Sequence, residues 1–289
     1  MAVQGIEIDD LPRLTRPILI AGFDGWGNAM GVSRGMADFL VRKLEAHPFA
    51  HLNPDLFFRY DENRPMVNIE EGVLQNVTVP GGSFYAARTP LEARDIVVLA
   101  SHEPGLKWFQ FVDELFYLCL QAGIGTVVTL GSMYDNVLHT DRRISGIVSS
   151  SELSAKLREM GILPVSYHGP SAIHSIIQSE GEKKGLICMS LWCHCPYYFQ
   201  GSNHFGLMSS LGKVLATLGE FDLDTSDLEK NWHAMERKID KLVAKNPEIQ
   251  KIISKIRKSQ DTESIRPRPK AVIKEGKKVI DLKDFLDPK

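Results

Sequence analysis

The sequence predicts an α/β fold: a three-layer α/β/α core with a mostly parallel sheet, followed by a helical extension at the C-terminus. Short runs that are apolar throughout are typical of strands buried on both faces of a parallel sheet. Stretches with helical spacing of apolar residues lie between these runs, which favours helical layers on the sheet. After Ser226 the apolar residues recur every three or four positions among many charges, as in amphipathic helices.

The chain length suits one core with an appendage, since 289 residues exceed a single typical domain only moderately. We expect a core domain over residues 1–225, a helical extension over 226–260 and an extended, mobile tail over 261–289. Pro247 should separate two helices in the extension, because proline interrupts a helix. Their apolar stripe packs either on the core of the same chain, which we favour, or on a neighbouring subunit.

The core begins with an apolar run over residues 17–23, which predicts a strand, and a glycine-rich turn leads from it into a helix over 28–45. Residues 55–80 alternate short apolar runs such as Leu-Phe-Phe-Arg-Tyr with turn residues, which indicates a β-rich insertion of antiparallel strands. Four further buried strands and three helices then alternate. The strands are expected at 95–101, 125–131, 162–167 and 186–192, and the helices at 107–122, 150–160 and 171–181.

The composition limits the classes of partner. Lys and Arg number 34 against 36 Asp and Glu, so no overall field attracts nucleic acid or an anionic membrane surface. No apolar run approaches the roughly 20 residues that cross a bilayer, and the first residues lack the basic start and apolar stretch of a secretory signal. The 4 cysteines are few for this length, which indicates reduced thiols. We therefore expect a cytoplasmic protein with no nucleic-acid or membrane partner.

Polar residues follow the expected strands, and in a parallel sheet the carboxyl ends of the strands meet at one edge, where ligands commonly bind. The sequence therefore predicts a candidate crevice at this edge. Ordinary turn chemistry is the alternative, because turns favour Gly, Asp and Pro whatever the function. The candidate crevice residues are Asp24, Trp26, Gly27, His102, Glu103, Asp135, His139, Thr140, His168, His194 and Tyr197.

The glycines of the first loop resemble the start of a dinucleotide motif. Gly25-Trp26-Gly27 begins the pattern, but Met30 occupies a position that needs a small residue, so a Rossmann cofactor site is not expected. A helix N-terminus after Gly27 offers backbone N–H groups to an anion, although glycines serving only a tight turn are the more common situation.

Cys193-His194-Cys195 suggests a metal site at first sight. On a strand the two cysteines face one side and the histidine the other, so the three side chains do not converge on one ion. We expect two buried thiols, no metal and no cofactor. Histidines and serines near the strand ends are available for acid–base or nucleophilic roles, but neither G-x-S-x-G nor a P-loop occurs. These candidates are His102 beside Glu103, His168, Ser101, Ser132 and Ser166.

The order of several short motifs resembles the proteasome assembly chaperone type 2 family over about residues 17–228. The motifs are Ile18–Gly27, Arg64-Pro65, Glu103–Trp108, Leu130-Gly131, His139-Thr140, Tyr167–Pro170, and Leu191-Trp192 with Pro196-Tyr-Tyr198. The resemblance implies a phosphorylase-like α/β/α fold and a bacterial or archaeal type of member. It also implies assembly as a homo-oligomer and, as in eukaryotic relatives, binding to protein subunits.

Two functions follow from the sequence, and we favour the first. The chain is expected to be a non-catalytic assembly protein that self-associates and binds protein partners, because no complete catalytic arrangement is present. The alternative is a small-molecule enzyme of nucleoside, phosphate or carboxylate–amine ligase type that uses the crevice, although fold alone does not establish function.

Overall fold

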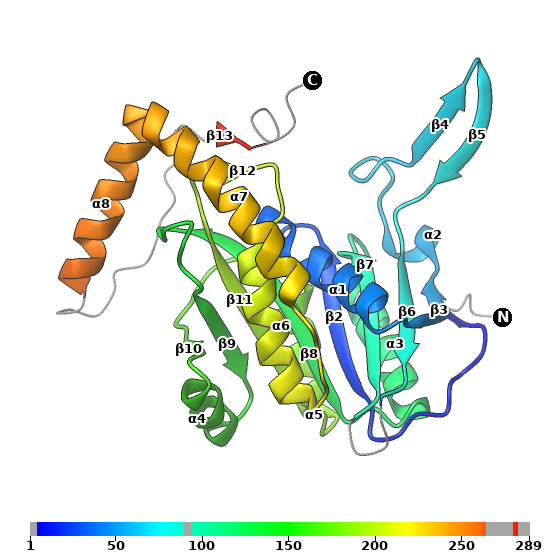
Figure 1. Ribbon diagram of the computed structural model, residues 1–289. Helices are drawn as coiled ribbons and strands as arrows, with labels where there is room; N and C mark the ends of the chain where they lie inside the picture. The colour runs from blue at the N-terminus through cyan, green and yellow to red at the C-terminus, as the bar shows by residue number, and fades with distance from the viewer. Residues whose placement is uncertain (1–4, 90–93, 264–279, 283–289) are drawn as a thin grey trace.

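The computed structural model describes residues 5–89, 94–263 and 280–282 of the chain (Figure 1). Its main sheet has nine strands in the order β1-β3-β6-β7-β2-β8-β11-β9-β10. The four central strands are parallel and almost wholly buried. They are β7 (Ile96–His102), β2 (Ile18–Asp24), β8 (Thr126–Asp135) and β11 (Ile187–Pro196). The predicted α/β class is confirmed.

Antiparallel strands extend this parallel centre on both sides, so the whole sheet is mixed. On one side lie β6 (Gly82–Ala87), β3 (His47–Leu52) and β1 (Ile6–Ile8), each antiparallel to its inner neighbour. On the other side, β9 (Ile144–Val148) runs antiparallel to β11 and parallel to β10 (Leu163–Pro164).

The prediction of a buried parallel strand over 162–167 is wrong for most of that segment. Only Leu163 and Pro164 form a strand, at the outer edge of the sheet, and both are exposed. An edge strand has no neighbour on its outer side, so apolar character alone does not place a segment in the buried centre.

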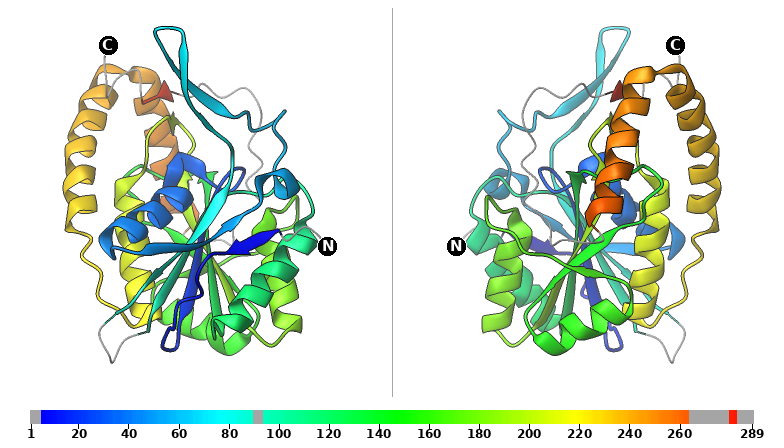
Figure 2. Two further views of the ribbon diagram at one scale, coloured as in Figure 1. Left: turned by 90° about the vertical axis from the view of Figure 1, so that its right-hand side faces the viewer. Right: turned by 90° about the vertical axis from the view of Figure 1, so that its left-hand side faces the viewer.

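Helices cover both faces of the sheet (Figure 2). One face packs on α1 (Val32–Lys43) and α6 (Phe205–Gly219), and the other on α3 (Trp108–Gln121) and α5 (Ile173–Lys183). Successive residues of β2 alternate between the two cores, as strands buried on both faces do. A further helix, α4 (Ser151–Glu159), packs beside β9.

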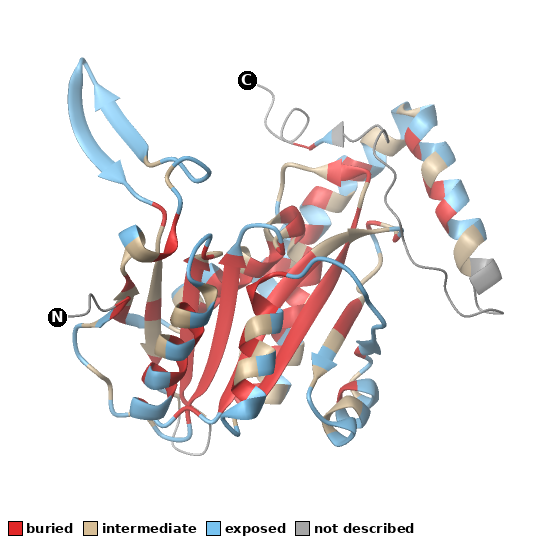
Figure 3. Ribbon diagram, turned by 180° about the vertical axis from the view of Figure 1, so that it is seen from behind, coloured by how far each residue is buried: buried red, intermediate tan, exposed pale blue. Residues whose placement is uncertain are grey.

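The β-rich insertion is a short helix followed by a hairpin. The run Leu-Phe-Phe-Arg-Tyr was expected to start a strand, but α2 (Pro54–Phe57) occupies its beginning because Asn53 caps the helix and Pro54 suits its first position. Strands β4 (Met66–Glu70) and β5 (Val73–Thr78) pair in a sheet of their own. The hairpin projects from the body of the molecule and is exposed along its length (Figure 3).

The C-terminal helices pack on the chain's own core. Helix α7 (Ser226–Lys245) lies along α6, and α8 (Pro247–Glu263) follows after a break at Pro247. The apolar stripe of α7 is buried in the core that includes α6, which agrees with the favoured alternative. Its members are Leu228, Trp232, Met235 and Ile239.

Most of the tail expected to be extended lies outside the described residues. Within it, β13 (Ile280–Asp281) pairs with β12 (Phe199–Gln200), and Leu282 is buried in the core. Among the described residues, no helix combines the length and apolar character needed to span a bilayer.

Candidate functional site

The loops after β2 and β7 are joined by the Glu103 carboxylate. It accepts hydrogen bonds from the Trp26 N–H (3.1 Å) and from the Ile173 N–H at the start of α5 (2.9 Å). Gly25 has a φ of 155°, and a Cβ there would lie 2.8 Å from the Glu103 Cβ, so this close approach requires glycine. Asp24 accepts from the Asn28 side chain at 2.8 Å. Both carboxylates are therefore used in holding the loops.

The ends of β8, β9 and β11 are joined by a second network. His194 Nδ1 donates to Asp135 Oδ2 (2.8 Å), and His194 Nε2 is hydrogen-bonded to the Ser145 hydroxyl (2.9 Å). Burial raises the pKa of Asp135, but the hydrogen bonds from His194 and the Asn136 N–H outweigh it, and the pKa is lowered overall. The carboxylate therefore stays ionised in the folded protein. Sequence patterns did not identify Ser145, because β9 was not predicted.

This Asp–His–Ser order is that of a hydrolase triad, but the burial is reversed. In a triad the serine meets the substrate and the aspartate lies behind the histidine. Here Asp135 is the most exposed member, with 16% of its side chain accessible, followed by His194 at 8%, and Ser145 is 2% exposed. The hydroxyl lies between strands and the acid faces outward. The arrangement fits a hydrogen-bonded clamp, meaning a link that holds three strands together, better than a catalytic nucleophile.

A third network starts at His139 and reaches the C-terminal helices. Tyr198 Oη accepts from the His139 N–H and donates to His139 Nδ1, both at 2.9 Å. The His139 carbonyl accepts from His204 Nε2 at 3.1 Å, and the His204 ring stacks on Trp232 of α7 with centroids 4.4 Å apart. The Arg142 guanidinium also lies over the Trp232 ring, with its central carbon 4.5 Å from the ring centroid.

Burial determines the charge states in this network. It lowers the pKa of His139 and lowers that of His204 to about 3, so the His204 imidazole is neutral. Burial also raises the pKa of Tyr198. Sequence reasoning missed His204 and Trp232 as network members, because their contacts join segments far apart in the chain.

The structure divides the candidate residues into two groups along the carboxyl edge. The ends of β2 and β7 carry the first group: Asp24, Trp26, Gly27, His102 and Glu103. The ends of β8 and β11 carry the second group: Asp135, His139, Thr140, His194 and Tyr197. The remaining candidate, His168, lies on the exposed loop before α5. His102 Nδ1 bonds to the Gly81 backbone, so it too serves a loop.

Metal and anion binding gain no support from the geometry. Cys193 and Cys195 lie in the apolar core while His194 faces Asp135, as strand alternation requires. Within the described ranges, no group of three or more His, Cys, Asp or Glu side chains is placed to hold a metal ion. At the start of α1 the Arg34 N–H already donates to the Asn28 side chain. Met30, which occupies the position that a dinucleotide motif keeps small, is buried.

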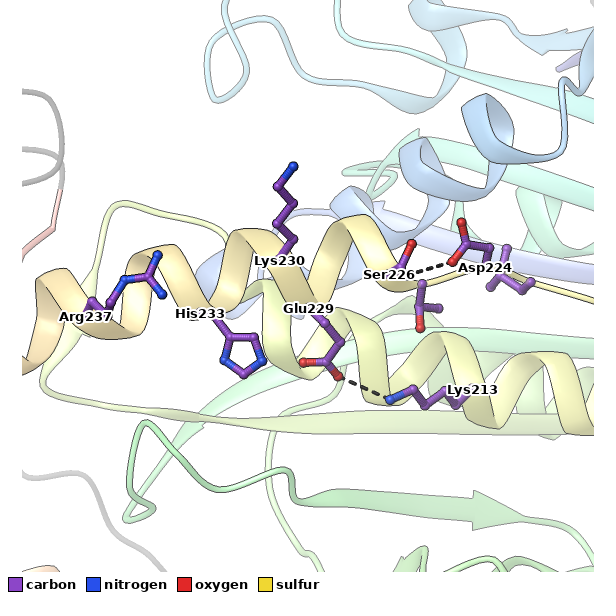
Figure 4. Close-up of a pocket in the computed structure, with 9 residues that line it drawn as sticks. Lys213, Asp224, Ser226, Glu229, Lys230, His233 and Arg237 are labelled. Carbon is purple, nitrogen blue, oxygen red and sulfur yellow. Dashed lines mark hydrogen bonds and ion pairs between the residues drawn. The ribbon is translucent and has the colours of Figure 1, made fainter.

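A groove that the sequence did not indicate lies away from the carboxyl edge, along α6 and the start of α7 (Figure 4). Its volume is about 770 Å³ and it is open to solvent. Both acidic and basic side chains line it, with Lys213 bonded to Glu229 at 3.2 Å and the Ser226 N–H donating to Asp224 at 2.9 Å. The groove therefore lacks a single sign of charge to select a ligand.

These features define a class of protein: an α/β chain whose polar groups at the strand ends bond to one another and to neighbouring loops. The family follows from comparison, because the PAC2 family model matches residues 19–243. The chain belongs to the PAC2 family, and the resemblance found in the sequence is confirmed.

Solved structures agree. A PAC2 family protein from Streptomyces avermitilis is 26% identical with a TM-score of 0.72, over 82% of this chain and 99% of that one. A proteasome-assembly chaperone homologue from Mycobacterium tuberculosis is 25% identical with a TM-score of 0.73 and the same coverage. A protein from Corynebacterium glutamicum shares the fold at a TM-score of 0.83 and 20% identity, over 92% of this chain and 100% of that one.

A relative is also found by sequence. A Methanocaldococcus jannaschii protein is 23% identical over 240 residues, covering 82% of this chain and 86% of its own length.

Proposed function

We propose that this protein is a non-catalytic, chaperone-like assembly protein of the PAC2 family that binds other polypeptides and self-associates in the cytoplasm. Family membership supports a chaperone-like role, and a similar structure from M. tuberculosis is described as a proteasome-assembly chaperone homologue. The four cysteines are free and buried, which suits a reducing compartment.

One observation carries the proposal. Three aromatic side chains in the segments that Glu103 ties together face solvent. Trp26 is 64% exposed in the loop after β2, Phe109 is 62% exposed in the first turn of α3, and Tyr167 is 64% exposed in the loop before α5. Exposed aromatic side chains supply most of the energy of many protein interfaces. This edge is therefore suited to binding the surface of another polypeptide.

The test compares two double variants that remove equal kinds of exposed apolar surface. Trp26→Ala with Phe109→Ala alters the carboxyl edge, and Tyr117→Ala with Leu120→Ala alters the far end of α3, where both side chains are also exposed. Each tagged protein captures partners from extract of the source organism under crosslinking, and candidates are then purified and titrated by calorimetry.

We expect one defined partner to bind the intact protein and the α3 control with equal affinity, and the edge variant at least tenfold more weakly. Equal binding by both variants would remove the carboxyl edge from the proposal. Turnover of a small molecule by the intact protein, lost in the edge variant, would replace the proposal with the enzymatic alternative.

A further inference from the structure

The β4–β5 hairpin has one apolar face and one largely polar face. Residues directly opposite each other on paired strands share a face. The pairs Val67–Val77 and Ile69–Leu74 therefore form one side, which we call the aliphatic face. The pairs Asn68–Asn76 and Glu70–Val73 form the other side, together with Met66–Thr78.

A bulge makes the aliphatic face continuous. The register shifts between Asn68 and Ile69, so that Gln75 is the extra residue in β5. Without this shift, a regular ladder counted from the tip would place Asn76 rather than Val77 opposite Val67. The bulge therefore assembles four aliphatic side chains on one side of the hairpin.

The aliphatic face is open. Each of its four side chains is more than half exposed, and every residue from 66 to 79 is exposed. The hairpin stands clear of the sheet and of the helices in all views (Figures 1–3). A two-stranded hairpin that covers no core is marginally stable in water. This surface is suited to burial against something outside the body of its own chain.

We propose that the aliphatic face is the contact between two copies of this chain, packed face to face about a two-fold axis. This inference rests on the self-association proposed above and names its surface. In a two-fold contact the same patch meets itself, so an aliphatic patch on one copy finds an aliphatic patch on the other.

The charges on the hairpin favour this occupant and its direction. The turn at the tip carries Glu71 and the base carries Arg64, both exposed. The neighbouring acids of the base, Asp61 and Glu62, pair with Arg59. The tip and base are roughly 23 Å apart, from seven residues at about 3.3 Å each. When two hairpins pack antiparallel, Glu71 of each copy lies over Arg64 of the other. Parallel packing would place like charges together.

The experiment measures sedimentation velocity of the full chain over a range of concentrations. A contact limited to one hairpin face belongs to the weak class of interfaces, so dissociation should appear within the concentration series. The face variant carries Val67→Thr and Val77→Thr, which keep the shape and strand preference of the residues. The control carries Asn68→Thr and Asn76→Thr on the opposite face.

We expect the unaltered chain and the control to dimerise alike, and the face variant to have a dissociation constant at least tenfold higher. Arg64→Glu should weaken the dimer, and Arg64→Glu combined with Glu71→Arg should restore it. Circular dichroism and the Tm of the diluted proteins check that each variant is folded.

A chain that stays monomeric at all concentrations would overturn the inference, as would equal dimerisation of the face variant and the control. Failure of the charge swap to restore the dimer would overturn the antiparallel arrangement. These outcomes are separate from those of partner capture: the Trp26 and Phe109 variant should still dimerise, and capture without dimerisation would leave the proposed function standing.

Discussion

The carboxyl edge of the sheet and the β4–β5 hairpin differ in what their side chains contact. At the edge, polar groups such as Asp135, His194 and Glu103 bond to other parts of the chain. On the hairpin, aliphatic groups face solvent and contact none of the core. The comparison separates residues that hold this fold together from residues available to another molecule, and stability measurements should divide along the same line.

The largest change in stability should come from lowering the pH, because this protonates, in the unfolded chain, histidines that are buried in the folded protein. Burial lowers the pKa of His174 to about 4 and of His204 to about 3, against about 6.5 in the unfolded chain. Both folded values lie below the unfolded value, so the stabilisation is present above pH 6.5 and is lost as the pH falls. The free energy of unfolding should drop by about 1.4 kcal/mol per pH unit for each histidine.

Urea unfolding between pH 6.5 and 5 measures this slope, because most carboxylates are still ionised there. His204→Gln should reduce the slope by about 1.4 kcal/mol per pH unit, whereas His168→Gln, on an exposed loop, should leave it unchanged. A stability that is flat across this interval would contradict the buried neutral histidines.

The next largest effect should come from Gly22→Ala in β2. A Cβ at Gly22 would lie 2.5 Å from the Ser33 carbonyl oxygen and 2.7 Å from the Ala37 Cβ of α1, and the backbone atom cannot move aside easily. We expect a loss of about 3 kcal/mol in the free energy of unfolding. Gly125→Ala is the matched control, because its Cβ would meet nothing within 4 Å. Equal losses from both substitutions would contradict this close packing.

His194→Ala should cost about 2 kcal/mol, because it leaves Ser145 and Asp135 without their shared partner. His168→Ala again serves as the control. The same variant tests the clamp against catalysis through labelling by a fluorophosphonate probe, which modifies activated serines. We expect no modification of Ser145, and labelling that disappears in His194→Ala would identify a nucleophile instead.

The smallest effect should come from the hairpin. In dilute, monomeric protein, Val67→Thr with Val77→Thr should change the free energy of unfolding by less than about 0.5 kcal/mol, as exposed substitutions usually do. Thermal unfolding at low and high concentration measures it. A loss above 2 kcal/mol in the monomer would mean that the aliphatic face is already covered by its own chain.

The sequence predicted the central strands best, because their burial is visible in their own residues. The runs at 17–23, 95–101, 125–131 and 186–192 are apolar on both faces, and the structure places strands over each of them in the parallel centre. The run at 162–167 failed because position in the sheet, not apolar content, decides burial. The insertion was expected to contain antiparallel strands, but their exposure depends on what lies next to them.

The site was predictable only in part, for the same reason. Asp135 and His194 could be named because each follows or ends a buried run. Their bond to each other, and to Ser145, depends on the order of strands in the sheet, which a single run does not encode. His174 was missed because nothing in its local pattern distinguishes a buried histidine on a helix from an exposed one.

The extra residue at Gln75 has a consequence for solubility. A regular hairpin with two free edges is a template onto which further strands add without limit, the route by which ordered fibres grow. Bulges increase local twist and interrupt such templating. Deleting Gln75 would keep the same cross-strand pairs while straightening the ladder, so the shortened chain should form fibres under conditions in which the intact chain stays dispersed.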